Sequence, residues 1–393
     1  MININEELTV FKNPEAAEKD RSYPKDLKSI LDMAHVQQTV RDIQAWPDYA
    51  VTPVHVLKEI ADEIGVNTIW YKDESSRFKL GSFKALGGAY AVAKQVINEL
   101  KKKHDLDLTV QDLLTGHYKK EISQISVSCA TDGNHGRSVA WGSRMFGCEC
   151  VIYIHKHVSK GREKAIEALG AKVIRIDGNY DDSVRQAAND AAKYQRLIVS
   201  DTSYPGYMDI PKDVALGYTV MFDELDRQMD NDIPSHIFIQ GGVGGLASAA
   251  CAYYWQKWQD KRPVFVIVEP VQANCLQQSA MNGRPTVVTG ELDTLMAGLA
   301  CGEVSLLAWD ILSIGTDYFT TINEETIAPC MRLLAQYGIE AGESAVPGLA
   351  ALIAGAHQHE LELDENSKVL LIGTEGATDP DLYETLTGIK PGR

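Results

Sequence analysis

Short apolar runs alternate with helical segments along most of this chain, and this alternation restricts the fold more than any other feature. Because a strand, a helix and a second strand in succession normally form a parallel pair, we expect an α/β fold with parallel-rich open sheets flanked by helices. Ligands of such sheets bind beyond the carboxyl ends of the strands, so functional residues are expected in the turns there. The clearest runs are NTIWYKDE (67–74), CECVIYIH (148–155), SHIFIQGG (235–242) and SKVLLIGTEG (367–376), and the clearest helical segments are ALGGAYAVAKQVINELKKK (85–103) and DDSVRQAANDAAKYQ (181–195).

The length of the chain predicts two domains. With 393 residues it exceeds one ordinary hydrophobic core. We expect a large domain formed by residues 1–90 and 196–393 and a small domain formed by residues 91–195. The polar stretch at residues 100–121 is typical of a surface insertion between a helix and a strand.

Charge and composition exclude several classes of partner. A formal net charge of −16 argues against nucleic acid and anionic membranes as partners. No apolar run approaches the roughly 18 residues that a membrane span needs. The N-terminal residues are polar and acidic, unlike a secretory signal, so we expect a cytoplasmic protein. The seven cysteines form no C-x-x-C pair and no zinc-like spacing with histidine, which predicts reduced, mostly buried thiols and no metal.

A glycine-rich turn lies between a strand-like run and a helical segment. Glycines let backbone N–H groups converge on an anion, and a helix N-terminus adds positive potential, so the turn predicts a phosphate-binding site. The turn also satisfies the G-x-G-x-x-A dinucleotide pattern, with Glu269 closing a later strand, so an NAD-dependent oxidoreductase is an alternative at this point. The residues of the turn are Gly241, Gly242, Val243, Gly244 and Gly245.

Lys84 has unusually small and apolar neighbours for a lysine. A helix that begins near Ser82 would place Lys84 in its first turn, where the helix dipole disfavours a positive charge. Poor solvation lowers the pKa of an amine further, which favours the neutral, nucleophilic form. Gly87 and Gly88 are expected to leave room for a flat ring beside it. Lys84 is therefore a candidate for a Schiff base, with an ordinary exposed lysine as the alternative.

Three further turns after strands carry polar residues. The turn at Thr131, Asp132, Gly133, Asn134 and His135 opens a helix and predicts a second anion site, such as one for a carboxylate. Asn134 can hydrogen-bond a phenolic oxygen, Asp132 is a candidate acid or a plain N-cap, and His135 is expected to be structural rather than catalytic.

Asp201 and Thr374 also follow strand-like runs. A neutral hydroxyl, such as that of Thr374, facing a pyridine nitrogen would leave that nitrogen unprotonated. Such a ring suits elimination better than transamination.

Four motifs in this order carry a resemblance. Ser82-Phe83-Lys84, Gly133-Asn134-His135, the glycine turn and Thr374 resemble the pyridoxal-phosphate enzymes of tryptophan-synthase-β type, known as fold type II, which include serine and threonine dehydratases. Seven segments are similar to the diaminopropionate ammonia-lyase family and extend over about residues 52–379: KDESSRF, LGGAYA, TDGNHGR, NYDDSVR, DTSYPGY, MAGLACGE and TEGATD.

This resemblance implies a two-domain fold with pyridoxal 5'-phosphate between the domains. It implies that Lys84 holds the cofactor next to Phe83, and that the glycine turn binds the phosphate. Asn134 would bind the ring oxygen and Thr374 the ring nitrogen. Asp132 and Asp201 would be catalytic, and the substrate would be bound by Thr131, Asp132, Gly133 and His135. Relatives of this fold type suggest a homodimer.

The implied reaction is the α,β-elimination of D- and L-2,3-diaminopropionate to pyruvate and two ammonia. A carboxylate facing the β-ammonium group would contribute about 1.5–3 kcal/mol to selectivity. A serine or threonine dehydratase is the alternative, because G-S-F-K is closer to the dehydratase pattern and GGVGG is richer in glycine than the family form. An NAD-dependent oxidoreductase leaves Lys84 without a role, and a non-catalytic amino-acid sensor needs neither Asp132 nor a reactive lysine.

Overall fold

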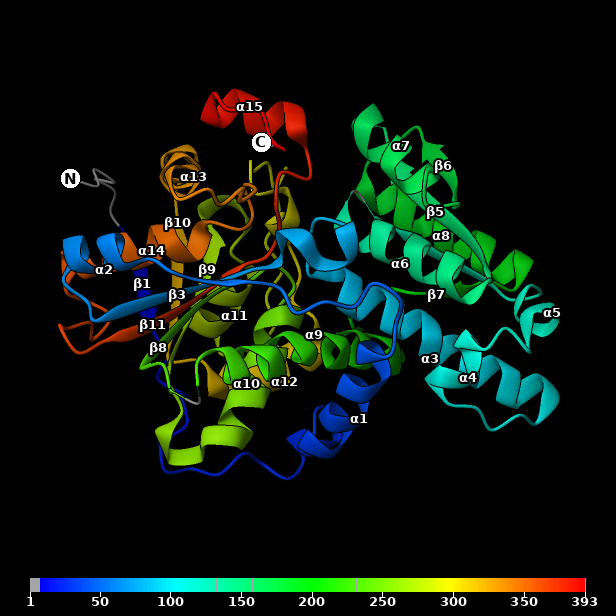
Figure 1. The fold of residues 1–393 in the computed structure, drawn as a ribbon, viewed down its shortest axis with the longest axis horizontal. Helices are drawn as coiled ribbons and strands as arrows, with labels where there is room; N and C mark the ends of the chain where they lie inside the picture. Colours follow the sequence, from blue (N-terminus) through cyan, green and yellow to red (C-terminus); the bar gives the residue numbers. More distant parts are fainter. Residues whose placement is uncertain (1–7, 132, 157, 231, 393) are drawn as a thin grey trace. The chain divides into compact units, whose positions relative to one another are not determined.

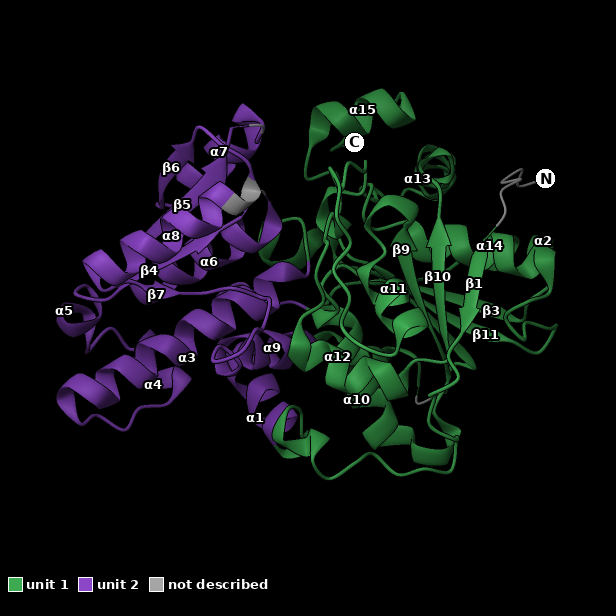
Figure 2. Ribbon diagram, turned by 180° about the vertical axis from the view of Figure 1, so that it is seen from behind, with its two compact units in different colours: residues 1–34, 51–82, 221–393 green, residues 35–50, 83–220 purple. Residues whose placement is uncertain are grey.

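The computed structural model describes residues 8–131, 133–156, 158–230 and 232–392 (Figure 1). The chain forms two compact units (Figure 2). The first unit comprises Met1–Ala34, Val51–Ser82 and Met221–Arg393, and the second comprises His35–Ala50 and Phe83–Val220. Across the described ranges, no helix is both long enough and apolar enough to cross a membrane.

The strands are β1 (Thr9–Lys12), β2 (Val54–Val56), β3 (Thr68–Asp73), β4 (Ser126–Ala130), β5 (Glu149–His155), β6 (Lys172–Ile176), β7 (Leu197–Ile198), β8 (His236–Gln240), β9 (Val264–Pro270), β10 (Tyr318–Ile322) and β11 (Lys368–Gly373). The α-helices are α1 (Met33–Gln44), α2 (Lys58–Ile64), α3 (Lys84–His104), α4 (Val110–Leu114), α5 (Lys119–Ile122), α6 (Asn134–Phe146), α7 (Lys160–Glu167), α8 (Tyr180–Tyr194), α9 (Asp209–Gln228), α10 (Gly245–Trp258), α11 (Cys275–Asn282), α12 (Leu306–Gly315), α13 (Ile327–Gln336), α14 (Pro347–Gln358) and α15 (Pro380–Thr387).

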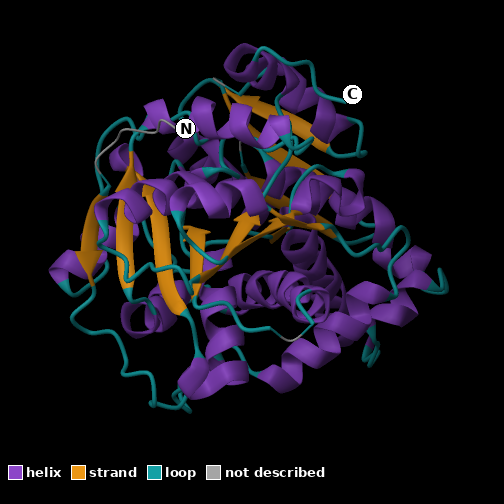
Figure 3. Ribbon diagram, turned by 60° about the vertical axis from the view of Figure 1, so that its left-hand side comes forward, coloured by secondary structure: helices purple, strands orange, loops and turns teal. Residues whose placement is uncertain are grey.

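The first unit is built on a seven-stranded sheet in the order β1-β10-β9-β8-β11-β3-β2. Strands β10, β9, β8, β11 and β3 are parallel, and the edge strands β1 and β2 are antiparallel to their neighbours. Helices α2 and α14 lie on one face and α10 and α12 on the other (Figures 1 and 3). Because both faces are covered, the central strands are continuous apolar runs rather than alternating ones.

The second unit contains a parallel four-stranded sheet in the order β6-β5-β4-β7. Helices α6 and α8 pack on β4 and β5, and α3 packs along α6. The two sheets confirm the prediction of parallel-rich sheets flanked by helices.

The second unit has other bounds than the small domain that we expected at residues 91–195. Helix α3 runs without a break from Lys84, so no border falls inside it. Trp46, from the separate segment His35–Ala50, packs against Trp141 with ring centroids 5.8 Å apart, which ties this segment to α6. The polar stretch at residues 100–121 forms the end of α3, the helix α4 and the start of α5.

The cysteines agree with the expectation of reduced thiols. All seven are free, six of them are buried, and Cys301 is partly exposed.

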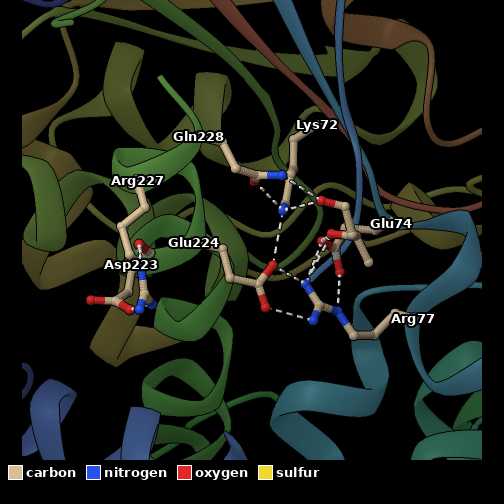
Figure 4. Close-up of polar contacts among 8 residues, drawn as sticks. Lys72, Glu74, Arg77, Asp223, Glu224, Arg227 and Gln228 are labelled. Atoms are coloured by element: carbon tan, nitrogen blue, oxygen red, sulfur yellow. Dashed lines mark hydrogen bonds and ion pairs between the residues drawn. The ribbon is translucent and has the colours of Figure 1, made fainter. Parts of the chain in front are cut away.

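A buried cluster of charged side chains connects β3, the short 3-10 segment after it and α9 in the first unit (Figure 4). The Arg77 guanidinium donates to both oxygens of Glu74, at 2.8 and 2.8 Å, and to both oxygens of Glu224, at 2.7 and 2.7 Å. Lys72 Nζ lies 2.8 Å from Glu224 Oε2. All four side chains are fully buried, and their two positive charges balance the two negative ones.

Replacing Glu224 with glutamine tests how much this cluster stabilises the first unit. Glu224→Gln leaves two buried cations with one carboxylate, so the free energy of unfolding should fall by about 3–5 kcal/mol in urea denaturation. The control is Arg227→Ala on the same helix, because Arg227 pairs with Asp223 at the surface and is 60% exposed. That variant should cost less than about 1 kcal/mol. Equal losses for both variants would contradict the cluster's role.

Candidate active site

Lys84 lies beside a carboxylate in the second unit. It is the first residue of α3, and its Nζ is 2.5 Å from Oδ2 of Asp201, which lies shortly after β7. Both side chains are 21% exposed, so a small molecule can reach them. The amine also lies 5.5 Å from the ring centroid of Phe83 and 5.9 Å from that of Tyr218, whose aromatic faces favour a cation. The structure therefore brings together Lys84, Phe83 and Asp201, which are three of the candidate site residues.

Asp201 is held in its ionised form. Burial by itself raises the pKa of a carboxyl group, but here the charge of Lys84 and its hydrogen bond outweigh burial and hold the pKa of Asp201 well below its usual range. Asp201 is thus a carboxylate at neutral pH and acts as the counter-ion of Lys84 across their hydrogen bond.

His135 is a buried member of the same group. Its Nε2 is 2.9 Å from the carbonyl oxygen of Val199, and its Nδ1 is 3.9 Å from Asp201 Oδ2. Burial lowers the pKa of His135, so the ring is neutral at pH 7. Because a carbonyl only accepts, Nε2 carries the hydrogen and Nδ1 is bare. Nδ1 has no hydrogen-bond partner within the part of the chain that the structure describes.

The turn before α6 has the predicted position. Helix α6 begins at Asn134, so Gly133 and Asn134 lie at the positive end of a helix dipole. Thr131 is buried, and its hydroxyl accepts from the Gly133 N–H at 3.3 Å. Asp132 lies outside the described residues. The proposed ligands of this turn stay predictions.

The space beside Gly87 and Gly88 is filled by the protein itself. A Cβ at Gly87 would lie 2.4 Å from the ring of Tyr218, and one at Gly88 would lie 2.4 Å from the hydroxyl of Ser138. The prediction that these glycines leave room for a ligand ring is therefore wrong. They let α9 and α6 approach α3 closely.

The glycine turn lies in the first unit, between β8 and α10. Gly242 and Gly244 have φ values of +60° and +96°, which side chains rarely adopt. A Cβ at Gly244 would also lie 2.9 Å from that of Ala308. The Ser305 N–H donates to the Val243 carbonyl at 2.9 Å and fixes the turn from outside. Since α10 begins at Gly245, its first-turn N–H groups lack acceptors within the helix, which fits a phosphate.

Glu269 is not available to a ligand, which removes the alternative of a dinucleotide site. Its side chain is fully buried below the glycine turn, where a Cβ at Gly241 would lie 2.7 Å from its Cγ. Its carboxyl group accepts from the N–H groups of Leu276 and Gln277, at 2.9 and 2.8 Å, at the start of α11. The acidic residue that would bind a ribose is thus used to cap a helix.

Thr374 follows β11 in the first unit and is also buried. Its hydroxyl donates to the carbonyl oxygen of Ser344 at 3.0 Å. A hydroxyl has one hydrogen, so donating to a ring nitrogen would require Thr374 to leave Ser344. Sequence reasoning missed Ser344, because no motif marks it and its contact depends on a segment 30 residues away.

The cluster around Lys84 and the glycine turn belong to different units. Sequence reasoning also missed Tyr218, which lies on α9 and contacts Lys84. The two residues are far apart along the chain, and no motif links them, so the sequence gives no signal for this contact. Within the described ranges, no group of three or more His, Cys, Asp or Glu side chains could hold a metal ion.

The buried position of Glu269 predicts a pH-dependent stability. Burial raises the pKa of Glu269 to about 8. The hydrogen bonds from the N–H groups of Leu276 and Gln277 lower the pKa, but burial has the larger effect. Between the ordinary pKa of about 4.3 and pH 8, folding therefore takes up a proton, so this group's stabilisation is full at low pH and is lost as the pH rises to 8. Glu269→Gln should lack this loss.

The measurement is the free energy of unfolding of both proteins in urea, between about pH 5 and about pH 8. As the pH rises, the stability of the variant relative to the wild type should increase. Glu291→Gln, at an exposed position, is the control and should follow the wild type. A constant difference between the wild type and Glu269→Gln would contradict the assignment.

Comparison with known proteins adds independent information. Residues 45–375 match the family of pyridoxal-phosphate dependent enzymes. The diaminopropionate ammonia-lyase of Salmonella typhimurium is 38% identical over 358 residues, which cover 86% of this chain and 88% of the relative.

Solved structures agree with this match. The diaminopropionate ammonia lyase from Escherichia coli in complex with D-serine aligns with a TM-score of 0.87 and 33% identity, over 97% of this chain and 97% of the other. The same enzyme in complex with an aminoacrylate-PLP azomethine reaction intermediate aligns with a TM-score of 0.85 and 32% identity, over 97% of each chain.

Proposed function

The chain belongs to the diaminopropionate ammonia-lyase family of pyridoxal-phosphate dependent enzymes, and on this premise we propose that it degrades D- and L-2,3-diaminopropionate. One molecule of substrate and one of water give pyruvate and two molecules of ammonia. The observation that carries the proposal is the contact of 2.5 Å between Lys84 Nζ and Asp201 Oδ2, which pairs the expected cofactor lysine with an ionised carboxylate.

Pyridoxal phosphate, when bound, supplies a ring that delocalises the negative charge left after removal of the α-proton. Lys84 would hold it covalently, with Phe83 next to it, and Gly241–Gly245 would bind its phosphate. The positive φ values of this turn and the start of α10 support the second role. Asn134 would bind the ring oxygen and Thr374 the ring nitrogen, which carries over the residues of the family motifs.

Two groups of the second unit would move protons. Lys84 Nζ would take a proton from the substrate, and Asp201 Oδ2 would stabilise the resulting ammonium group through the hydrogen bond between them. Lys84 would return this proton to the departing amine, so that the amine leaves as ammonia. Asp132 would be the second acid or base, and the two carboxylates would serve the two isomers. The substrate would be bound by Thr131, Asp132, Gly133 and His135.

D-Serine is a second candidate substrate, because the Escherichia coli relative forms a complex with it. The pattern Gly81-Ser82-Phe83-Lys84, which is closer to the dehydratases, favours it as well. Loss of water from serine would also give pyruvate and ammonia, so substrate rates must separate the two activities.

A substrate panel tests the proposed function. The purified protein, loaded with pyridoxal phosphate, is assayed for pyruvate release from D- and L-diaminopropionate and D- and L-serine, and for 2-oxobutyrate release from threonine. We expect the largest kcat/KM for diaminopropionate. A larger value for serine or threonine would instead assign a dehydratase, and no product from any substrate would reject a lyase.

Replacing Asp132 tests the second carboxylate. Asp132→Asn removes the charge that would face the β-ammonium group, worth about 1.5–3 kcal/mol, so kcat/KM for diaminopropionate should fall about tenfold to a hundredfold. Cofactor content, measured by visible absorbance, should stay within twofold. Asp107→Asn is the control, because Asp107 is 89% exposed and pairs with Lys101 at the surface. Unchanged activity in Asp132→Asn would remove this residue from the mechanism.

We also propose that the enzyme is a cytoplasmic homodimer. The support is analogy with fold type II relatives for the dimer and, for the location, the seven free cysteines, which suit a reducing compartment. Light scattering of the purified protein tests the dimer.

A further inference from the structure

The hydroxyl of Tyr207 bridges two backbone groups just before Asp201. It accepts from the N–H of Ser200 at 2.9 Å and donates to the carbonyl oxygen of Ile198 at 2.9 Å. One phenol thus holds both ends of the tripeptide Ile198–Ser200, and Asp201 is the next residue. Both bonds lie within the second unit.

This tripeptide needs support because the strand before it is short. Strand β7 pairs with β4 at only two positions, Leu197 with Val127 and Ile198 with Ser128. One further ladder bond, from the Val199 N–H to the Ser128 carbonyl, measures 2.9 Å. Ser200 then turns its N–H to Tyr207 instead of to a strand. Without the phenol, this N–H would lack its partner, which costs free energy in a partly buried segment.

The same tripeptide also fixes the histidine next to Asp201. The carbonyl oxygen of Val199, the central residue, accepts from His135 Nε2 at 2.9 Å. A change in the path of residues 198–200 would therefore move the Asp201 carboxylate and the His135 ring together. The carboxylate contacts Lys84, and the ring lies beside the carboxylate.

A tight turn brings Tyr207 to this position. The N–H of Tyr207 donates to the carbonyl of Tyr204 at 2.8 Å, and Gly206 has a φ of +84°. Pro205 before such a glycine is typical of a type II turn. The rings of Tyr204 and Tyr207 stack with centroids 4.9 Å apart, so Tyr204, which is 48% exposed, covers its neighbour.

We propose that Tyr207 is a positioning residue that holds Asp201 at hydrogen-bond distance from Lys84. This proposal rests on the proposed function for its effect on turnover, but not for its effect on the backbone. Burial raises the pKa of the Tyr207 phenol above its ordinary value, so the hydroxyl keeps its proton and donates throughout the working pH range. Among the described residues, the titratable groups around Asp201 are Lys84 on α3, His135 on α6, Cys129 on β4, Tyr207 itself and Tyr218 on α9.

The test is Tyr207→Phe, which keeps the ring and its stacking and removes both hydrogen bonds. In the cofactor-free protein, we expect the Ser200 amide to exchange its hydrogen at least tenfold faster than in the wild type. NMR titration of the Asp201 carboxyl should also show a higher pKa, since the carboxylate is less firmly held beside Lys84. The control is Tyr204→Phe, which keeps the stacked rings and removes the hydroxyl of a residue that is 48% exposed.

In the loaded enzyme, Tyr207→Phe should lower kcat for diaminopropionate at least tenfold, with KM and cofactor content within twofold of the wild type. The acid limb of the kcat profile should move to higher pH. Wild-type behaviour of the exchange rate, the Asp201 titration or kcat would each overturn the proposal, and so would equal effects in Tyr204→Phe. A wild type that does not act on diaminopropionate would reject the proposed function alone, because exchange and titration still decide the role of Tyr207.

Discussion

The hydrogen bond between Lys84 and Asp201 is the interaction on which the proposed chemistry of this protein depends. It joins the first residue of a helix to a residue that follows a two-residue strand. Neither end is fixed by the pair itself. Close packing at Gly87 and Gly217 sets the position of α3 against α9, and hydrogen bonds at residues 198–200 set the other end. A contact of 2.5 Å thus results from the packing of the whole second unit.

Two lysines twelve residues apart show how differently the fold treats the same side chain. Lys72 is fully buried, and Glu224, Gln228 and the Thr52 carbonyl accept from its ammonium group, so it serves to connect elements. Lys84 has a side chain that solvent partly reaches, with a carboxylate and two aromatic rings around its amine. Burial and the number of partners, rather than residue type, separate a structural lysine from a reactive one.

The sequence predicted what local patterns determine. Apolar runs and glycines gave the parallel sheets, the glycine turn before α10 and the helix starts near Lys84 and Asn134. It did not predict contacts that depend on distant segments. The burial of Glu269 against α11, the filling of the space at Gly87 by Tyr218 and the bridge from Tyr207 each require a fold in which two remote stretches meet. The bounds of the units were missed for the same reason, since residues 35–50 join the second unit through Trp46.

The order of segments along the chain has a consequence for synthesis on the ribosome. The second unit is complete once Val220 has emerged, so it can fold while the rest is still being made. Strand β3, by contrast, pairs in parallel with β11, whose residues 368–373 are translated long after those of β3. Until then an apolar strand near the N-terminus lacks its main neighbour, and such an open edge promotes association with other nascent chains. Slow translation of the residues between β3 and β11 would lengthen that exposure, and chaperone demand would be highest in this interval.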